Sequence, residues 1–202
     1  MPSAAELLSL NDLLWLWQAY DPAVKSDLYS TAVKAGATLF LIDPISLEPA
    51  PRQQLFAAAS DHIVLLTNAN HLRAAADFAA QFKAAVFAST EAGAAAAGLP
   101  ARAILDGEQI ASGVTAIAIE GAAPGEIVFH FAENGGTLVV GDALINFEPY
   151  GFTFLPPKYC SDPKAMRRSL RGLLDFSFNR MLFAHGIPIM DSARQKLETL
   201  LA

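Results

Sequence analysis

The polar residues that follow residue 66 are the ones in this chain whose types and position could do chemistry. The apolar run at 63–66 predicts a buried strand, and apolar side chains recur at helical spacing after it. The strand therefore delivers a polar group to its carboxyl end, where the chain turns into a helix: Asn68, Asn70, His71 and Arg73. Ligands usually bind at that edge in layered α/β proteins, so we expect a cleft there.

Other predicted strands also end in polar residues. Short apolar runs precede Asp43, Asp142 and His185, and each run is followed by a turn. A first β-rich half is indicated by a hairpin over 27–42, a helix over 49–60, a strand at 63–66, a helix over 71–83 and a strand at 84–88. Residues 89–100 are nearly all Ala and Gly, which fits either a helix or a connection.

A second β-rich half follows. It contains hairpins over 103–111 and 114–131, strands at 137–140 and 180–184, a helix from the Asp162 cap to about 176, and a final helix capped by Asp191. These patterns alone predict an α/β protein with a mixed sheet. The first twenty residues fit a short helix and a strand. Trp15 and Trp17 there pack in the core or, alternatively, form an exposed aromatic patch at a homodimer contact.

Composition narrows the functional classes. The chain has 202 residues, 53% of them hydrophobic, which is enough for one domain with a sizeable core. A net charge of -6 argues against nucleic acid as a partner, and no apolar run is long enough to span a bilayer. Cys160 is the single cysteine, so no internal disulfide forms, and the first residues lack the basic start of a secretory signal. We expect a cytoplasmic protein.

Five segments, taken in chain order, resemble the metallo-β-lactamase superfamily. The strand ending in Thr67 and the hexad Asn68-Ala69-Asn70-His71-Leu72-Arg73 resemble its His-x-His-x-Asp-His loop. The other segments are Leu41 to Pro44, Gly121 to Glu126, Leu138 to Leu144 and Phe183 to Gly186. The resemblance implies an α/β (α+β) fold, a four-layer αββα sandwich, as a single domain over residues 1–202.

Family members hydrolyse esters, amides, thioesters or phosphoesters with one or two metal ions that polarise the substrate and activate water. Carried over by position, Asp142 and His185 remain as ligands. The counterparts in the first metal site are Asn68, Asn70 and Ala122, and amide oxygens are poor zinc ligands.

In the second site the counterparts of two ligands are Leu72 and Arg73, neither of which can coordinate an ion. The resemblance therefore implies an eroded metal centre. We expect the Arg73 guanidinium to occupy the region of the lost metal and to pair with Asp142 or a nearby acceptor. The alternative is that Arg73 is a solvated residue on the helix surface.

The remaining candidates have simpler interpretations. Asn70 fits a helix N-cap and Asn68 a turn residue. His62 and His130 lie in or beside strands and fit structural roles. His71 occupies a non-ligand position of the family motif, but a shift of one residue would turn it toward Asp142 and His185.

Three functions follow. The first is a metallo-β-lactamase-fold protein with an eroded centre that is non-hydrolytic or binds a small-molecule ligand, with no cofactor and no assigned catalytic residue. The second is a divergent hydrolase of an ester or phosphoester that uses no metal or one ion, zinc, iron or manganese, held by His71, Asp142 and His185. The third is a homo-oligomeric structural protein with the two tryptophans at a homodimer contact.

Overall fold

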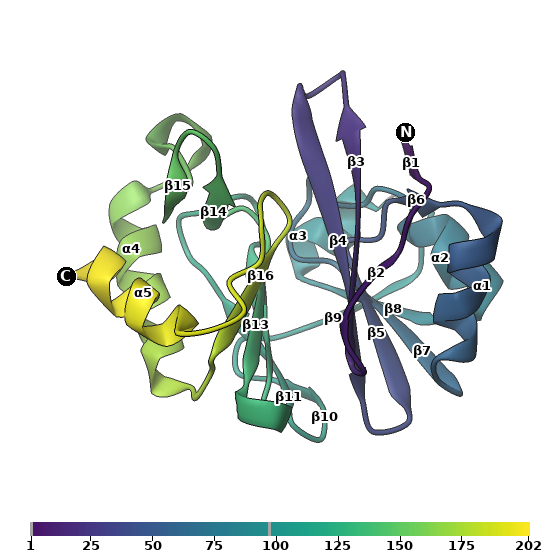
Figure 1. Ribbon diagram of the computed structural model, residues 1–202. Helices are drawn as coiled ribbons and strands as arrows, with labels where there is room; N and C mark the ends of the chain where they lie inside the picture. Colours follow the sequence, from purple (N-terminus) through teal and green to yellow (C-terminus); the bar gives the residue numbers. More distant parts are fainter. Residues whose placement is uncertain (1, 97) are drawn as a thin grey trace.

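The computed structural model describes residues 2–96 and 98–202 and contains two main β-sheets (Figure 1). The seven-stranded sheet has the order β2 (Leu8–Asn11), β3 (Leu14–Asp21), β4 (Ser26–Ala35), β5 (Thr38–Ile42), β7 (Asp61–Leu65), β8 (Ala85–Ala88) and β9 (Ala101–Ala103). The five-stranded sheet has the order β10 (Gln109–Ala111), β11 (Val114–Ala118), β12 (Ile127–Phe131), β13 (Thr137–Val140) and β16 (Arg180–Phe183). Two short pairs join β1 (Ser3–Ala4) to β6 (Ser46–Leu47) and β14 (Leu144–Phe147) to β15 (Gly151–Phe154).

Helices cover the outer face of each sheet, as Figure 1 shows. Those beside the seven-stranded sheet are α1 (Pro49–Ala57), α2 (Ala75–Phe82) and α3 (Thr90–Ala95), and those beside the five-stranded sheet are α4 (Pro163–Arg171) and α5 (Ala193–Leu201). Short 3-10 turns occur at η1 (Glu133–Gly135), η2 (Pro157–Tyr159) and η3 (Gly172–Asp175). Among the described residues, every helix is too short or too polar to cross a bilayer.

Strand side chains alternate between two faces, and this alternation builds separate cores. In β5, Leu39 and Leu41 pack toward the helices, whereas Phe40 and Ile42 pack toward the other sheet. In β13, Leu138 belongs to the core under α4 and α5, and Val139 belongs to the core between the sheets. Apolar cores therefore lie on both faces of each sheet, which confirms the predicted four-layer αββα sandwich.

The parallel strands fix where the functional residues lie. Strand β5 pairs in parallel with β7, and β13 pairs in parallel with β16. Because parallel strands end at one edge, the residues after Ile42 and Leu65 lie side by side, as do those after Val140 and Phe183. The backbone N–H of Tyr29, in β4, donates to the carbonyl of Ala184 after β16 at 3.0 Å and joins the two sheets at this end. All four strand ends thus open onto one region.

The structure confirms the predicted strands at 63–66, 84–88, 137–140 and 180–184 within a residue or two at each end. It also confirms the hairpins over 27–42 and 114–131, and the cap of α4 by Asp162, whose carboxylate accepts from the N–H groups of Lys164 and Ala165. The first half of the Ala- and Gly-rich segment is helical, as α3, and residue 97 lies outside the described residues.

Several predicted boundaries were wrong. The helix expected from 71 starts at Ala75, and Ala74 rather than Asn70 is its N-cap, because the side chain of Asn68 already accepts the Asn70 N–H in a local turn. The hairpin over 103–111 does not form: β9 pairs with β8 in one sheet, and β10 pairs with β11 in the other. The Asp106-Gly107 turn instead carries the chain between sheets.

Two further corrections concern the ends of the chain. Residues 8–21 form the β2–β3 hairpin, and no helix occurs in the described part of the first twenty residues. The final helix has Ser192 at its N-cap, and Asp191 instead accepts from the Asn179 amide at 2.9 Å. The β14–β15 hairpin was not predicted, since its residues carry both apolar and turn-forming side chains.

Trp17 is a core residue and does not contribute to an exposed aromatic patch. Its side chain is 2% exposed, stacks on Phe78 of α2 and donates from Nε1 to the carbonyl of Ile45 at 3.0 Å. Trp15 is half-buried against the same core. The proposed homodimer contact through both tryptophans is therefore wrong for Trp17, and the core interpretation holds.

Replacing Trp17 by Ala should lower the free energy of unfolding by about 3 to 5 kcal/mol, because it leaves a cavity between β3 and α2. The Trp15→Ala variant is the control and should cost less, since its side chain is partly solvated. Urea unfolding followed by circular dichroism measures both. Equal losses in the two variants would contradict this assignment of the core.

Candidate metal centre

The imidazole of His71 is held in one orientation by the ends of two strands. Its Nδ1 lies 2.9 Å from Asp43 Oδ2 and 2.8 Å from Thr67 Oγ1. The Thr67 hydroxyl also donates to Asp43 Oδ2 at 2.5 Å, and the Thr67 N–H donates to Asp43 Oδ1 at 2.8 Å. Nδ1 is therefore the donor toward Asp43, and Nε2 points the other way, toward the interior of the cleft.

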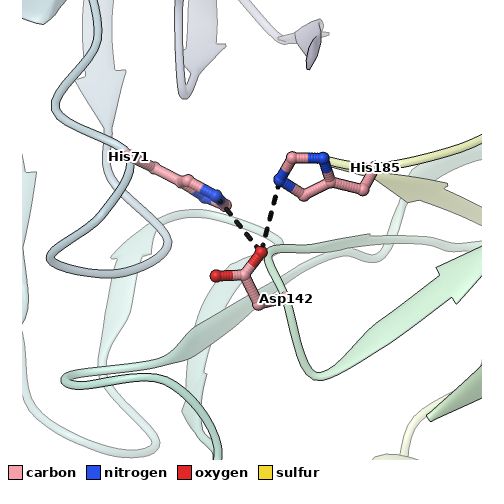
Figure 2. Close-up of side chains that lie close together, drawn as sticks. All are labelled: His71, Asp142 and His185. Carbon is pink, nitrogen blue, oxygen red and sulfur yellow. Dashed lines mark ion pairs between the residues drawn. The ribbon is translucent and has the colours of Figure 1, made fainter. Parts of the chain in front are cut away.

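Three side chains converge at that point, as Figure 2 shows. His71 Nε2 lies 3.3 Å from Asp142 Oδ1, and His185 Nε2 lies 3.5 Å from the same oxygen. Each of the three residues offers one possible ligand atom, and these three atoms all lie within 4.8 Å of one another. The described residues thus contain two imidazoles and a carboxylate in an arrangement that could hold one metal ion.

His185 is positioned by contacts with β4 and β14. Its Nδ1 faces the carbonyl of Asp27 at 3.3 Å and the hydroxyl of Ser26 at 3.5 Å, both at the start of β4. The loop after β16 is tied to β14, because Asn146 donates its backbone N–H to the His185 carbonyl at 3.2 Å. These contacts leave His185 Nε2 free to face Asp142.

Asp142 reaches His71 because Gly141 has no side chain. A Cβ at Gly141 would lie 2.5 Å from Thr67 Oγ1 and 2.9 Å from Glu126 Oε1. Such distances are too short for any real contact, so only glycine lets the end of β13 approach the end of β7 this closely. The sequence pattern Gly141-Asp142 thereby sets the depth of the carboxylate in the cleft.

Asn68 and Glu126 fill the space beside Asp142. The Asn68 amide donates to Glu126 Oε2 at 2.7 Å and to Asp142 Oδ2 at 3.1 Å. Glu126 Oε1 accepts the backbone N–H groups of Asp142 at 2.8 Å and Ala143 at 3.0 Å. Asn70 is exposed and takes no part in this network, and Ala122 is buried in the core under α4.

Arg73 is drawn into the protein and does not lie on a solvated helix surface. Its backbone is left-handed, with φ of 41°, and its guanidinium donates to the carbonyls of Tyr29 at 2.5 Å and Asp43 at 3.1 Å. A weaker contact reaches the Ala184 carbonyl at 3.5 Å. The guanidinium therefore pairs with backbone acceptors at the junction of the sheets. Among the described residues, no ion pair joins it to Asp142.

The charges of the cleft shift the pKa values of its histidines in opposite directions. Burial alone lowers the pKa of His71, but the carboxylates of Asp142 and Asp43 outweigh burial and raise it to about 9. Burial and the charge on His71 lower the pKa of His185 to about 4. In the absence of a metal, His71 is therefore a cation near neutral pH and His185 is neutral.

The pKa values of the two carboxyl groups beside the histidines also shift in opposite directions. Burial and the neighbouring Asp142 raise the pKa of Glu126 to about 8. Burial opposes ionisation of Asp142 as well, yet His71 and His185 hold the pKa of that carboxyl well below its usual range. Burial lowers the pKa of Arg73, and the charges of Asp43 and Asp142 counteract this effect. Asp142 is thus the ionised acceptor of the cleft.

Sequence reasoning placed six residues in the cleft, and the structure treats them differently. His71, Asp142 and His185 converge, Asn68 contacts Asp142, Arg73 lies at the border of the cleft, and Asn70 faces solvent. Roles for Thr67 and Glu126 were missed. The available signal for Glu126 was its position directly before an apolar strand, because a carboxylate that becomes buried there needs hydrogen-bond partners.

The other histidines have structural contacts. His62 stacks on Phe56, and its Nε2 lies 3.2 Å from the Phe56 carbonyl; His130 Nε2 lies 2.9 Å from the carbonyl of Ser177. A cavity of about 260 Å³ lies at the opposite ends of the strands, lined by Val33, Phe131 and Arg180 among others. None of the three converging residues lines it.

Comparison with known proteins identifies the fold independently. A family model described as metallo-beta-lactamase superfamily matches residues 7–202. No curated protein sequence matches the chain. The fold is similar to that of the DIM-1 metallo-β-lactamase, with a TM-score of 0.75 and 11% identity over 99% of this chain and 97% of that one.

Two other solved structures are similar. A metallo-β-lactamase from Hirschia baltica has a TM-score of 0.71 and 18% identity, over 98% of this chain and 96% of that one. A metallo-β-lactamase family protein from Thermus thermophilus has a TM-score of 0.64 and 23% identity, over 96% of this chain and 79% of that one. At these identities the likeness concerns the fold alone.

Stability of the metal-free protein should fall as pH rises from about 6.5 to 9. The folded state raises the pKa of His71 to about 9, so its stabilisation is complete below the unfolded value near 6.5 and is lost above it. Glu126 acts in the same direction up to about pH 8. The loss from His71 is roughly 2 to 3 kcal/mol.

Urea unfolding in EDTA at several pH values measures this dependence. The slope between pH 6.5 and 9 should be shallower in the His71→Gln variant, which keeps only the Glu126 contribution, whereas the His62→Gln control should keep the wild-type slope. A wild-type stability that stays level across this range would contradict the ion pairing assigned to His71.

Proposed function

Because this chain belongs to the metallo-β-lactamase superfamily, we propose that it is a one-metal member that hydrolyses an ester or phosphoester. His71, Asp142 and His185 hold a single divalent ion, zinc, iron or manganese. The observation that carries the proposal is the orientation of His71. Its Nδ1 is taken by Asp43 and Thr67, and its Nε2 faces the Asp142 oxygen that His185 also approaches.

The donor set fits one such ion. Two imidazole nitrogens and one carboxylate oxygen are common protein ligands for these metals and leave coordination positions open. A carboxylate behind a histidine is a frequent second contact in metal sites, because it fixes the ring and its tautomer. Asp43 has this position behind His71. A second ion finds no comparable set, since Asn68, Asn70 and Ala122 stand in place of imidazoles.

The chain's own residues then have distinct tasks. Asp43 and Thr67 orient His71, while Asp27 and Ser26 orient His185. Asp142 presents one oxygen to both rings. When bound, the ion would supply Lewis acidity toward a carbonyl or phosphoryl oxygen. Binding requires His71 Nε2 to lose its proton, so affinity for the ion should rise with pH.

A second candidate is a metal-free, ligand-binding protein, and the charge balance of the cleft favours it. His71 as a cation lies between the carboxylates of Asp43 and Asp142 and satisfies both without an ion. Arg73 adds a second buried positive charge nearby. In this case the cleft would bind a small molecule through Asp142 and His185 and would hydrolyse nothing.

Metal content separates the two candidates. The protein, purified without chelator and dialysed at pH 7.5, should carry about one equivalent of zinc, iron or manganese by elemental analysis. The His185→Ala variant should lose most of it, and the His62→Ala control should retain it. Wild-type protein that neither carries nor takes up any of the three ions by titration calorimetry would support the metal-free candidate instead.

The carboxylate behind His71 should tune affinity for the ion. The Asp43→Asn variant should bind zinc about 10- to 100-fold more weakly, because the amide no longer fixes the ring as firmly. Asp61→Asn, an exposed change at the start of β7, is the matched control and should leave the dissociation constant unchanged. An unchanged constant in Asp43→Asn would remove Asp43 from the metal centre.

Hydrolysis is tested with activated esters and phosphodiesters. Metal-loaded protein should turn over at least one class of 4-nitrophenyl substrate, and EDTA or the Asp142→Asn change should reduce the rate at least tenfold. Loaded protein that is inactive on the whole panel would oppose the hydrolase assignment while leaving the metal site intact.

A further inference from the structure

The amide of Asn68 has a fixed orientation. Its Oδ1 accepts the backbone N–H of Asn70 at 2.9 Å, so the oxygen must face the turn. The NH₂ group therefore points in the other direction, into the protein, where the side chain is completely buried. An exchange of the two amide atoms would place the NH₂ group against an N–H donor, so the hydrogen-bond network permits only one assignment.

The NH₂ group lies where two carboxyl groups converge. The amide nitrogen donates one hydrogen to Glu126 Oε2, 2.7 Å away, and the other to Asp142 Oδ2, 3.1 Å away. Both hydrogens of the amide are thus used. The oxygens face a common donor, which is the arrangement that two carboxylates adopt around a small cation.

Glu126 is held in place for this contact. Its other oxygen accepts the N–H groups of Asp142 and Ala143, and its side chain is 3% exposed. The backbone also joins the two segments, because the Ile127 N–H donates to the Thr67 carbonyl at 2.7 Å. The position of Glu126 beside Asn68 is therefore set by both main chain and side chain.

We infer that Asn68 determines how many ions this cleft takes: its NH₂ group occupies a latent cation site between Glu126 and Asp142 and excludes a second ion. The inference deepens the one-metal function proposed above and rests on it for the count of one. Asp142 Oδ1 faces the two histidines, whereas Oδ2 faces Asn68. The two oxygens of one carboxylate thus serve two neighbouring positions, one for an ion and one for an amide.

The Asn68→Asp variant tests this directly. It replaces the donor by a carboxylate of nearly equal size and places three carboxyl groups around one point. Metal-free Asn68→Asp should unfold at lower urea concentration than the wild type, because the hydrogen bond to Asp142 becomes a repulsive contact between two buried carboxylates. Oxygen ligands suit Mn²⁺, so added Mn²⁺ should restore much of the lost stability.

Asn70→Asp is the matched control. It makes the same chemical change two residues away, at an exposed side chain that contacts neither carboxyl group. Its unfolding midpoint should stay within error of the wild type with and without Mn²⁺. Native mass spectrometry should show one more bound Mn²⁺ in Asn68→Asp than in the wild type and no additional ion in Asn70→Asp.

A double variant shows whether the added ion binds at the latent site, separately from the ion of the proposed function. Asn68→Asp with His185→Ala should keep the added Mn²⁺, because the latent site does not use His185. If the wild type binds no ion, the proposed function fails, yet Asn68→Asp should still gain one. Two ions in the wild type, or no gain and no extra destabilisation in Asn68→Asp relative to Asn70→Asp, would overturn the inference.

Discussion

The buried carboxylate of Asp43 is the feature on which the rest of the cleft depends. It lies at the end of β5, is 2% exposed, and accepts the backbone and hydroxyl of Thr67 as well as Nδ1 of His71. An unpaired carboxylate at this depth would cost several kcal/mol, so these contacts stabilise the fold. They join two parallel strand ends and give His71 its single orientation.

Three carboxyl groups line the cleft, and each accepts hydrogen bonds from an imidazole, an amide or both. His71 serves Asp43 and Asp142, Asn68 serves Asp142 and Glu126, and Arg73 donates to backbone carbonyls at the junction of the sheets. Under the proposed function, the Asn68 amide lies where a second ion would bind, and His71, Asp142 and His185 are the ligands of the single ion.

Local patterns predicted the main strands and the α/β class, whereas the four-layer arrangement was predicted only from the family resemblance. Short apolar runs followed by polar turns located β5, β7, β13 and β16, and their carboxyl ends do meet. Arg73 points toward the protein rather than solvent, and its acceptors are nearby backbone carbonyls instead of Asp142. The predictions of a hairpin over 103–111 and of the start of α2 were wrong. Sheet membership depends on tertiary contacts, and the turn at Asn68 competes with the first turn of the helix.

The side-chain network was beyond sequence reasoning for a related reason. His71 lies one residue away from a ligand position in the motif, and only the irregular backbone of residues 68–74, ahead of α2, turns it inward. Glu126 and Thr67 act through partners far away in the chain, such as Asp142 and Asp43. Residue type and spacing do not predict the close approach of Gly141 to Thr67 and Glu126, nor the contacts of Asp142 that this approach allows.

Crystals grown with zinc, measured above and below the zinc absorption edge, test the central claim most directly. The account predicts one anomalous peak per chain, within coordination distance of His71 Nε2, Asp142 Oδ1 and His185 Nε2, with the Asn68 amide still bonded to Glu126. Two adjacent peaks in this cleft, or full zinc occupancy at other residues with His71 still paired to Asp142, would contradict it.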